Sequence, residues 1–214
     1  MIALTDSARA EPTRDEAAQA LRQAVEYFRT EVAVEGGYLW VYTADFSMRE
    51  GEKPTTPTTV WVQPPGTPSV GLAYLSAFEL TGDPYYLESA RETAHALLRG
   101  QLQSGGWDYL IDFNPERRTK FAYRADGNMQ GRNITTLDDN ATQAALRCLM
   151  RVDRALDFKD AALHEGAIYA LRKLMEAQYP NGAWPQRFTD APEPDKYPVM
   201  AATYPEEWSK TFPK

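Results

Sequence analysis

Three stretches of the chain combine carboxylates, amides, arginines and aromatic rings in a way that ordinary loops do not. They cover residues 105–112, 135–142 and 180–188. The middle stretch contains Asp138, Asp139 and Asn140, three consecutive oxygen donors at the start of an apolar, helix-like segment. Such residues cap helices, because Asp and Asn accept hydrogen bonds from the free amides of the first turn. Adjacent carboxylates also suit a cation such as calcium, so capping and metal binding by Asp138 and Asp139 both stay open.

The other candidate residues would recognise a sugar that carries carboxylates. Aromatic rings in loops suit the apolar faces of sugars, and an arginine can bind a carboxylate through two parallel hydrogen bonds. The candidate ligand-binding residues, besides the three above, are Trp107, Asp108, Tyr109, Arg124, Arg132, Trp184, Gln186 and Arg187. For the tryptophans the alternative role is packing between helices, and for the arginines it is a solvated loop of mixed charge.

Composition excludes several other kinds of site. A single cysteine, Cys148, allows neither a disulfide framework nor a thiolate metal cluster, and His95 and His164 are too few for a histidine-rich site. The formal net charge of −7 argues against nucleic acid as the main partner. Apolar runs are too short for a membrane-spanning helix, so we expect no membrane partner. Residues 1–10 lack the basic and apolar regions of a signal peptide, which leaves the compartment open.

The elements that position these residues are expected to be helices. Apolar residues recur at helical spacing in five segments, at about 15–28, 69–80, 84–99, 139–156 and 161–176. Ser69 is the expected N-cap of the second helix, and Pro84 suits the first turn of the third. Long loops cover about 36–68 and 104–137, and a Pro-rich loop follows Trp184 to the last residue. No stretch alternates for long enough to predict a sheet, so the expected class is all-α.

An internal repeat predicts how the helices pack. Gln101 to Trp107 and Gln178 to Trp184 both read Q-x3-G-x-W, and each follows a helical hairpin. The glycine suits a left-handed turn at a helix end, and the tryptophan is expected to fold back between neighbouring hairpins. Repeated hairpins pack side by side and close into a ring. We therefore expect residues 1–214 to form a single α/α toroid domain, a ring of helical hairpins that lacks its last helical unit.

Two of the stretches together resemble a known enzyme family. The sequence TTLDDNATQAALRCL, followed some forty residues later by EAQYPNGAWPQRF, is similar to the family 10 polysaccharide lyases, the pectate or pectic acid lyases. Asp138 matches the acidic residue that opens the family's Asp-Asn-x-Ala-Thr motif, and Asp139 stands where the family often has asparagine. Trp184, Pro185 and Gln186 match the family's Gly-Gly-Trp-Pro-Gln segment, with Ala183 replacing the second glycine.

The resemblance implies an (α/α)3 toroid that cleaves polygalacturonate, or a similar acidic polysaccharide, by calcium-assisted anti β-elimination. It also implies a secreted or periplasmic protein, and a catalytic arginine that matches no residue of this sequence, so the catalytic base is unknown. A toroid fragment that binds acidic glycans without cleaving them is the second hypothesis. A third is an α/α-toroid glycoside hydrolase or epimerase, which would need paired carboxylates. For that role Asp138 and Asp139 are a poor pair, because neighbouring side chains are expected to diverge, which leaves Asp108 and Asp112.

Overall fold

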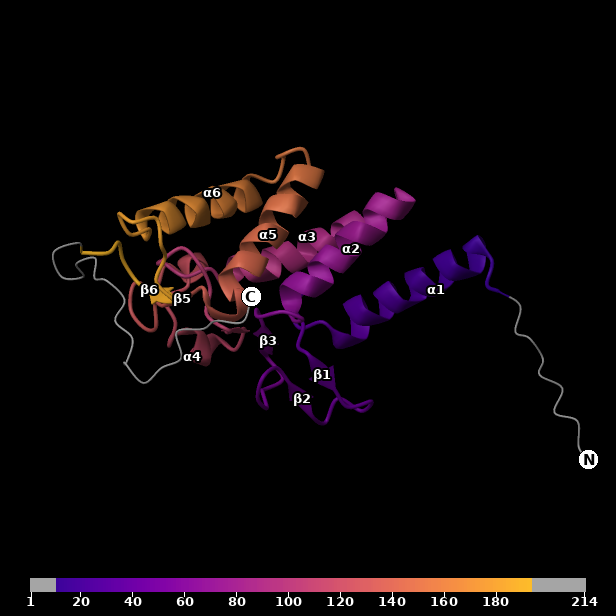
Figure 1. Cartoon of the computed structure of the whole chain (residues 1–214). Coiled ribbons are helices and arrows are strands. Elements are labelled where there is room, and N and C mark those ends of the chain that lie inside the picture. Colours follow the sequence, from indigo (N-terminus) through magenta and orange to yellow (C-terminus); the bar gives the residue numbers. More distant parts are fainter. Residues whose placement is uncertain (1–10, 194–214) are drawn as a thin grey trace, which may run out of the picture.

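The computed structural model describes residues 11–193. Its main helices are α1 (Arg14–Tyr27), α2 (Thr67–Thr81), α3 (Pro84–Arg99), α5 (Ala141–Ala155) and α6 (Ala161–Glu176), as Figure 1 shows. Shorter helical segments are the π-helix Phe28–Val32, α4 (Pro115–Arg118) and two 3-10 turns, Arg124–Asp126 and Asp138–Asn140. The five helices predicted from periodicity are therefore all present. None of the described helices is long and apolar enough to cross a bilayer.

Small antiparallel sheets show that the predicted all-α class is wrong. The strands are β1 (Val41–Tyr42), β2 (Arg49–Glu50), β3 (Thr59–Trp61), β4 (Leu110–Asp112), β5 (Thr135–Thr136) and β6 (Arg187–Phe188). They pair as β1–β2, β3–β4 and β5–β6, so the molecule mixes helices with sheet. Strands of two or three residues are too short to produce an alternating pattern, and for this reason the sequence did not predict them.

The hairpins α2–α3 and α5–α6 pack against each other and do not close into a ring within the described residues (Figure 1). Helix α3 contacts α2, α5 and α6, and α5 also contacts α2. The expected toroid is thus replaced by two neighbouring hairpins with loops and small sheets at one end. That residues 1–214 form one domain stays a prediction, because residues 1–10 and 194–214 lie outside the described residues. The expectations about a signal peptide and about part of the final loop concern these same residues.

Local signals explain where most helices begin. Thr13 and Glu16 form a capping box at α1, while Asp83 and Asp160 cap α3 and α6 through their side chains. Helix α2 differs from the prediction, because it begins at Thr67 after Gly66 and not after Ser69. The Thr67 hydroxyl is instead engaged with the backbone of Tyr38, at 2.9 Å from its N and 3.1 Å from its O, which ties this helix start to the preceding loop.

The repeat is built from the same hydrogen bonds in both units. Gln101 Nε2 donates to Gly105 O at 3.0 Å, and Gln178 Nε2 donates to Gly182 O at 2.8 Å. Both glycines have positive φ, as the left-handed turn requires. The indole N–H of Trp107 donates to Leu97 O at 2.7 Å, and that of Trp184 donates to Leu174 O at 2.8 Å. Each tryptophan therefore folds back onto the last turn of the helix before it.

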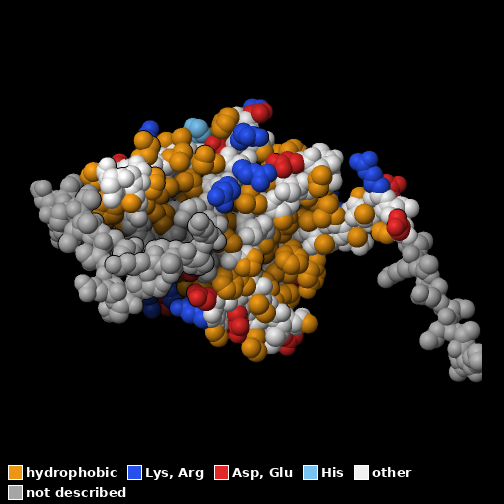
Figure 2. All heavy atoms as spheres, viewed as in Figure 1, with side chains coloured by type: hydrophobic (Ala, Val, Ile, Leu, Met, Phe, Trp, Pro, Cys, Tyr) orange, Lys and Arg blue, Asp and Glu red, His pale blue; other side chains and the backbone are white. Residues whose placement is uncertain are grey.

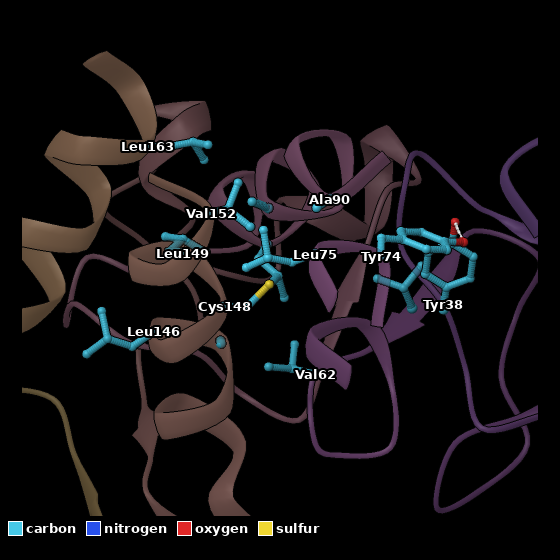
Figure 3. Close-up of a cluster of buried hydrophobic side chains, with 14 of the residues drawn as sticks. Tyr38, Val62, Tyr74, Leu75, Ala90, Leu146, Cys148, Leu149, Val152 and Leu163 are labelled. Carbon is cyan, nitrogen blue, oxygen red and sulfur yellow. Dashed lines mark hydrogen bonds between the residues drawn. The ribbon is translucent and has the colours of Figure 1, made fainter. Parts of the chain in front are cut away.

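The core lies where α2, α3 and α5 meet. Leu75, Ala90, Cys148, Leu149 and Val152 are buried there, and Figure 3 shows them facing one another between the helices. At one side of this cluster the Tyr74 hydroxyl donates to that of Tyr38 at 2.8 Å. Cys148 is fully buried, as expected for a small apolar residue, and burial raises the pKa of its thiol to about 12. The two hairpins thus form a rigid base for the loops at their end.

Candidate functional site

The strand pair β5–β6 brings together the two sequence motifs that lie some forty residues apart. Thr136 pairs with Arg187 across the pair, and the next residue, Leu137, donates its N–H to Gln186 O at 2.8 Å. This register places Gln186 and Arg187 beside Asp138, where the chain leaves β5 and turns into α5. This pairing is the structural reason that the two motifs lie side by side, and nothing in the sequence beyond their order indicated it.

The segment that contains Tyr109 is held against the start of α5 by Thr142 and Gly106. The Thr142 hydroxyl accepts from Trp107 N at 3.1 Å and is 3.2 Å from Trp107 O. A side chain on Gly106 would collide with Thr135 and Thr142, because a Cβ there would lie 2.4 Å from Thr135 Cγ2. Only glycine permits this close approach, which carries the Tyr109 ring to the acidic turn.

Tyr109 is the point at which the two carboxylates meet. Its hydroxyl lies 3.2 Å from Asp138 Oδ2 and 3.3 Å from Asp139 Oδ2, and Gln186 Nε2 donates to the same Asp138 oxygen at 2.6 Å. The prediction that the two aspartate side chains diverge is therefore wrong. Asp139 and Asn140 adopt left-handed backbone conformations, with φ of 51° and 61°, and this tight turn directs both carboxylates to one side.

The acidic turn does not cap helix α5. Neither Asn140, which occupies the N-cap position, nor Leu137 before the 3-10 turn makes a side-chain capping hydrogen bond. Within residues 11–193, Asp138 Oδ1 accepts only from the adjacent N–H of Asp139, at 3.1 Å. The capping interpretation of these three residues is therefore not what the structure shows, and the carboxylates of Asp138 and Asp139 face the Tyr109 hydroxyl instead.

Arg187 supplies a positive charge at the same place. Its guanidinium lies over the Tyr109 ring at 5.7 Å from the centroid, and Nη2 is 3.5 Å from the Tyr109 hydroxyl. Its contact with that hydroxyl raises the pKa of Arg187, and nearby Asp108 and Asp138 act in the same direction. Arg187 makes no ion pair with a carboxylate of residues 11–193, and its Nε and Nη2 contact only the hydroxyls of Thr136, at 3.4 Å, and Tyr109, so its charge remains available to an acidic ligand.

Asp108 and Arg132 form an ion pair next to Tyr109. Asp108 is buried, and its Oδ1 accepts from the N–H of Tyr109 at 2.9 Å, so its role is to fix this segment. Asp112 is likewise buried and is bound by Arg117 at 2.5 Å. Both carboxylates that the hydrolase hypothesis required are thus held by arginines and are not directed at a ligand.

Two of the predicted ligand-binding residues lie outside this site. The Arg124 guanidinium donates to Gln101 at 2.5 Å and Glu165 at 2.7 Å and stacks on Tyr169, so it joins α6 to the first repeat loop. Trp107 is fully buried between the hairpins and cannot contact a sugar. Trp184 differs from Trp107 although the repeat makes them equivalent, because its side chain is 46% exposed.

A hollow of about 520 Å³ adjoins the acidic turn. Trp184, Pro185 and Leu174 form an apolar wall, while Asp138, Asp139 and Gln186 form a polar edge. Gln143 also lines the hollow. Gln143 was not predicted from the sequence. Because it follows Asp139 by four positions, about one helical turn, its spacing could have identified it. An apolar wall opposite a polar edge suits a sugar ring, which has an apolar face and a rim of polar groups.

The acidic turn fits a cation only if a ligand completes its coordination. Calcium takes six to eight oxygen ligands. The turn offers the converging carboxylates of Asp138 and Asp139 with the amide of Asn140 next to them, and no group of three or more His, Cys, Asp or Glu side chains in the described part of the chain could hold a metal. The two carboxylates supply fewer oxygens than calcium takes, so calcium binding at this turn stays a prediction that would need water and an acidic ligand to complete the coordination.

A second hollow, of about 400 Å³, lies along the outer side of α3 and contains Arg29, Arg91 and Arg99. Each of these arginines already has a carboxylate partner: Glu92 for Arg29, Glu88 and Asp160 for Arg91, and Glu35 for Arg99. This hollow offers no unpaired cation comparable with Arg187, so the acidic turn is the better candidate site.

Comparison with known proteins agrees with the motifs. Residues 114–207, just under half of the chain, match the family model described as pectic acid lyase. The match includes the acidic turn, Trp184, Gln186 and Arg187, and it confirms the resemblance to family 10 polysaccharide lyases. No curated protein matches the chain.

Two solved structures are similar to the model. One is a family 10 polysaccharide lyase from Cellvibrio cellulosa, with a TM-score of 0.46 and 14% identity over 82% of this chain and 56% of that chain. The other is a mutant of a family 10 lyase from the same organism in complex with trigalacturonic acid, with the same TM-score and identity over 80% of this chain and 56% of that one. The chain thus spans just over half the length of these enzymes.

Proposed function

Taking the pectic acid lyase match of residues 114–207 as the premise, we propose that this chain binds polygalacturonate and takes part in its cleavage by β-elimination. The observation that carries the proposal is the convergence of Asp138, Asp139 and Gln186 beside the unpaired guanidinium of Arg187. The acidic turn would hold a calcium ion, and Arg187 would bind a galacturonate carboxylate. We further propose that the protein acts outside the cytoplasm, as a secreted or periplasmic protein, where this polymer is met.

The reaction that we propose removes the proton on C5 of a galacturonate unit. This proton is α to a carboxylate, and as a base takes it the C4–O4 bond breaks and a C4–C5 double bond forms. The oxygen departs with the neighbouring sugar and takes up a proton from solvent to become a hydroxyl. When bound, calcium would neutralise the carboxylate and stabilise the negative charge that develops on it. Arg187 would orient the same or a neighbouring carboxylate, and Trp184 would support the ring from its apolar side.

Binding without cleavage is the second candidate, and a specific observation favours it. A base at this site would need a pKa low enough to lose its proton near neutral pH. Contact with Tyr109 raises the pKa of Arg187, and burial, reinforced by Asp138, raises that of Tyr109. The two groups nearest the acidic turn are therefore protonated, and no described residue is assigned as the base.

Calorimetric titration of the chain with oligogalacturonate, with and without calcium, tests the proposal. We expect Asp138→Ala to weaken calcium-dependent binding by roughly 10–100-fold, as loss of a ligand to a shared cation does. Asp15→Asn, which removes an exposed carboxylate from the first turn of α1, is the matched control and should bind like the wild type. Equal binding by Asp138→Ala and the wild type would contradict the assignment.

The same samples distinguish the two candidate functions. A lyase forms a C4–C5 unsaturated product, which is followed by its ultraviolet absorbance. The lyase function is supported if the wild type binds in the presence of calcium and forms the unsaturated product, and if Asp138→Ala forms none. Binding without any product supports the glycan-binding function.

A further inference from the structure

The exposed face of α5 carries a row of arginines that the proposed site does not use. Arg147, Arg151 and Arg154 are exposed, and Met150 lies among them with 43% of its side chain accessible. Figure 2 shows blue Lys and Arg side chains gathered over this helix. The row is unusual for a chain whose formal net charge is −7.

Two of these arginines have no carboxylate partner among the residues that the structure describes. Arg151 pairs with Glu79 of α2 at 2.9 Å, whereas Arg147 and Arg154 make no ion pair or side-chain hydrogen bond with residues 11–193. The face therefore keeps a local positive charge, which acts over about 10 Å at 0.1 M salt. Unpaired guanidinium groups are well suited to bind carboxylates of another molecule.

The row continues directly from the candidate site. Gln143, which lines the hollow beside Asp138, precedes Arg147, Arg151 and Arg154 by four, eight and eleven positions. At 3.6 residues per turn these positions share one face of a helix, and a rise of about 1.5 Å per residue spreads them over roughly 16 Å. A ligand that leaves the hollow along α5 would thus meet the arginines one after another.

We propose that this arginine row, Arg147, Arg151 and Arg154, is an extended binding surface for the same acidic polysaccharide chain that occupies the hollow. The inference rests on the proposed function, because it assumes an acidic polysaccharide in the hollow. Such a polymer presents a carboxylate on every sugar, which matches a line of guanidinium groups, and Met150 offers an apolar contact for a sugar face. The row therefore favours long substrates over short ones.

The test compares trigalacturonate with a galacturonate nonamer, by calorimetry at low salt on the full chain. The wild type should bind the nonamer more tightly than the trimer. The variant R147Q/R154Q should lose roughly tenfold in nonamer affinity while its trimer affinity is unchanged, since each exposed charge contact has a modest effect. The control R14Q/R172Q removes two charges from exposed arginines on α1 and α6 and should retain the wild-type preference.

The outcomes separate this inference from the proposed function. Equal nonamer affinity in R147Q/R154Q and the control would overturn the arginine row and leave the site at Asp138 standing. A loss in R147Q/R154Q with no effect of Asp138→Ala would support the row and overturn that site, and no binding by the wild type would overturn both. If a glutamate nonamer binds the wild type as tightly as the galacturonate nonamer does, and loses affinity equally in R147Q/R154Q, the assignment to a polysaccharide is overturned.

Discussion

At the scale of single residues, chemistry at the candidate site depends on which charged groups have no partner within the protein. Arg132 and Arg187 both lie near Tyr109, yet Arg132 is bound to Asp108, whereas Arg187 makes no ion pair with a carboxylate in the described part of the chain. Arg187 is therefore the residue best placed to recognise a carboxylate of the ligand. This difference between the two arginines allows the role of Arg187 to be tested separately from that of the proposed calcium ion.

We expect Arg187→Ala to lose the ability to distinguish an acidic oligomer from its methyl ester. Esterification removes the charge that the guanidinium binds, so the wild type should prefer the free acid by roughly tenfold, the value of one charge-assisted pair. Arg187→Lys should retain only part of this preference, because an ammonium lacks the planar fork. Titrations in the presence of a calcium chelator measure the effect without the metal. An undiminished preference in Arg187→Ala would show that another group reads the carboxylate.

Residue types near a site could be predicted from the sequence, but their partners could not. Asp138, Gln186 and Arg187 lie together because they follow recognisable motifs on a shared strand pair. Arg124 has the same loop character, yet it meets Glu165, which lies 41 positions away. Such a long-range ion pair depends on how the hairpins pack, and the loop composition alone does not contain that information.

At the scale of elements, the repeat was predictable because its contacts are local. The glutamine contacts a carbonyl four positions later and the tryptophan contacts one ten positions earlier, so the motif carries its own geometry. The pair β5–β6 was not predictable, because its two-residue strands are joined across fifty positions of the chain. Pairing of this kind is decided by the packing of the hairpins that separate the strands.

The two tryptophans make a matched test of this element. Both indole N–H groups donate to a helix carbonyl, but Trp107 is fully buried and Trp184 is 46% exposed. Trp107→Phe removes a buried hydrogen bond to Leu97 O, which then keeps, among residues 11–193, only the N–H of Gly100, and leaves a gap in the core, so we expect a loss of about 2–4 kcal/mol in the free energy of unfolding. In Trp184→Phe, water can replace the lost hydrogen bond to Leu174 O, so the free energy of unfolding should fall by less than about 1 kcal/mol. Denaturant titrations of both variants give the values, and equal losses would contradict the difference in burial.

At the scale of the whole molecule, buried or half-buried aspartates hold neighbouring elements together both in the loop region and in the helical base. Asp112 at the end of β4 accepts from Arg117 of α4 at 2.5 Å and from the Thr58 hydroxyl at 2.8 Å. Asp160 at the start of α6 contacts His95 at 2.8 Å and Arg91 at 3.3 Å, both on α3. Although burial acts to raise the pKa of each aspartate, these contacts outweigh it and lower both pKa values.

Acid should therefore weaken the fold through these groups. A carboxyl whose pKa is lower in the folded state binds fewer protons there than in the unfolded chain, so its stabilisation is complete well above its unfolded pKa of about 3.9 and is lost as the pH falls through the folded value. We expect Asp112→Asn to be less stable than the wild type by about 1–3 kcal/mol at pH 7. That difference should shrink steadily below about pH 4, as the wild-type carboxyl takes up its proton.

Guanidinium unfolding of both proteins between pH 7 and pH 3 measures the difference directly. The Asp15→Asn variant is the control, because that exposed carboxylate makes no side-chain hydrogen bond or ion pair with residues 11–193, and its profile should follow that of the wild type. A difference between Asp112→Asn and the wild type that stays constant down to pH 3 would mean that the contacts of Asp112 stabilise the fold by shape and not by charge. A difference that disappears in acid would instead show that Asp112 acts as an ion. Its carboxylate would then hold β4, the strand that follows Tyr109, to α4 and to the loop at Thr58.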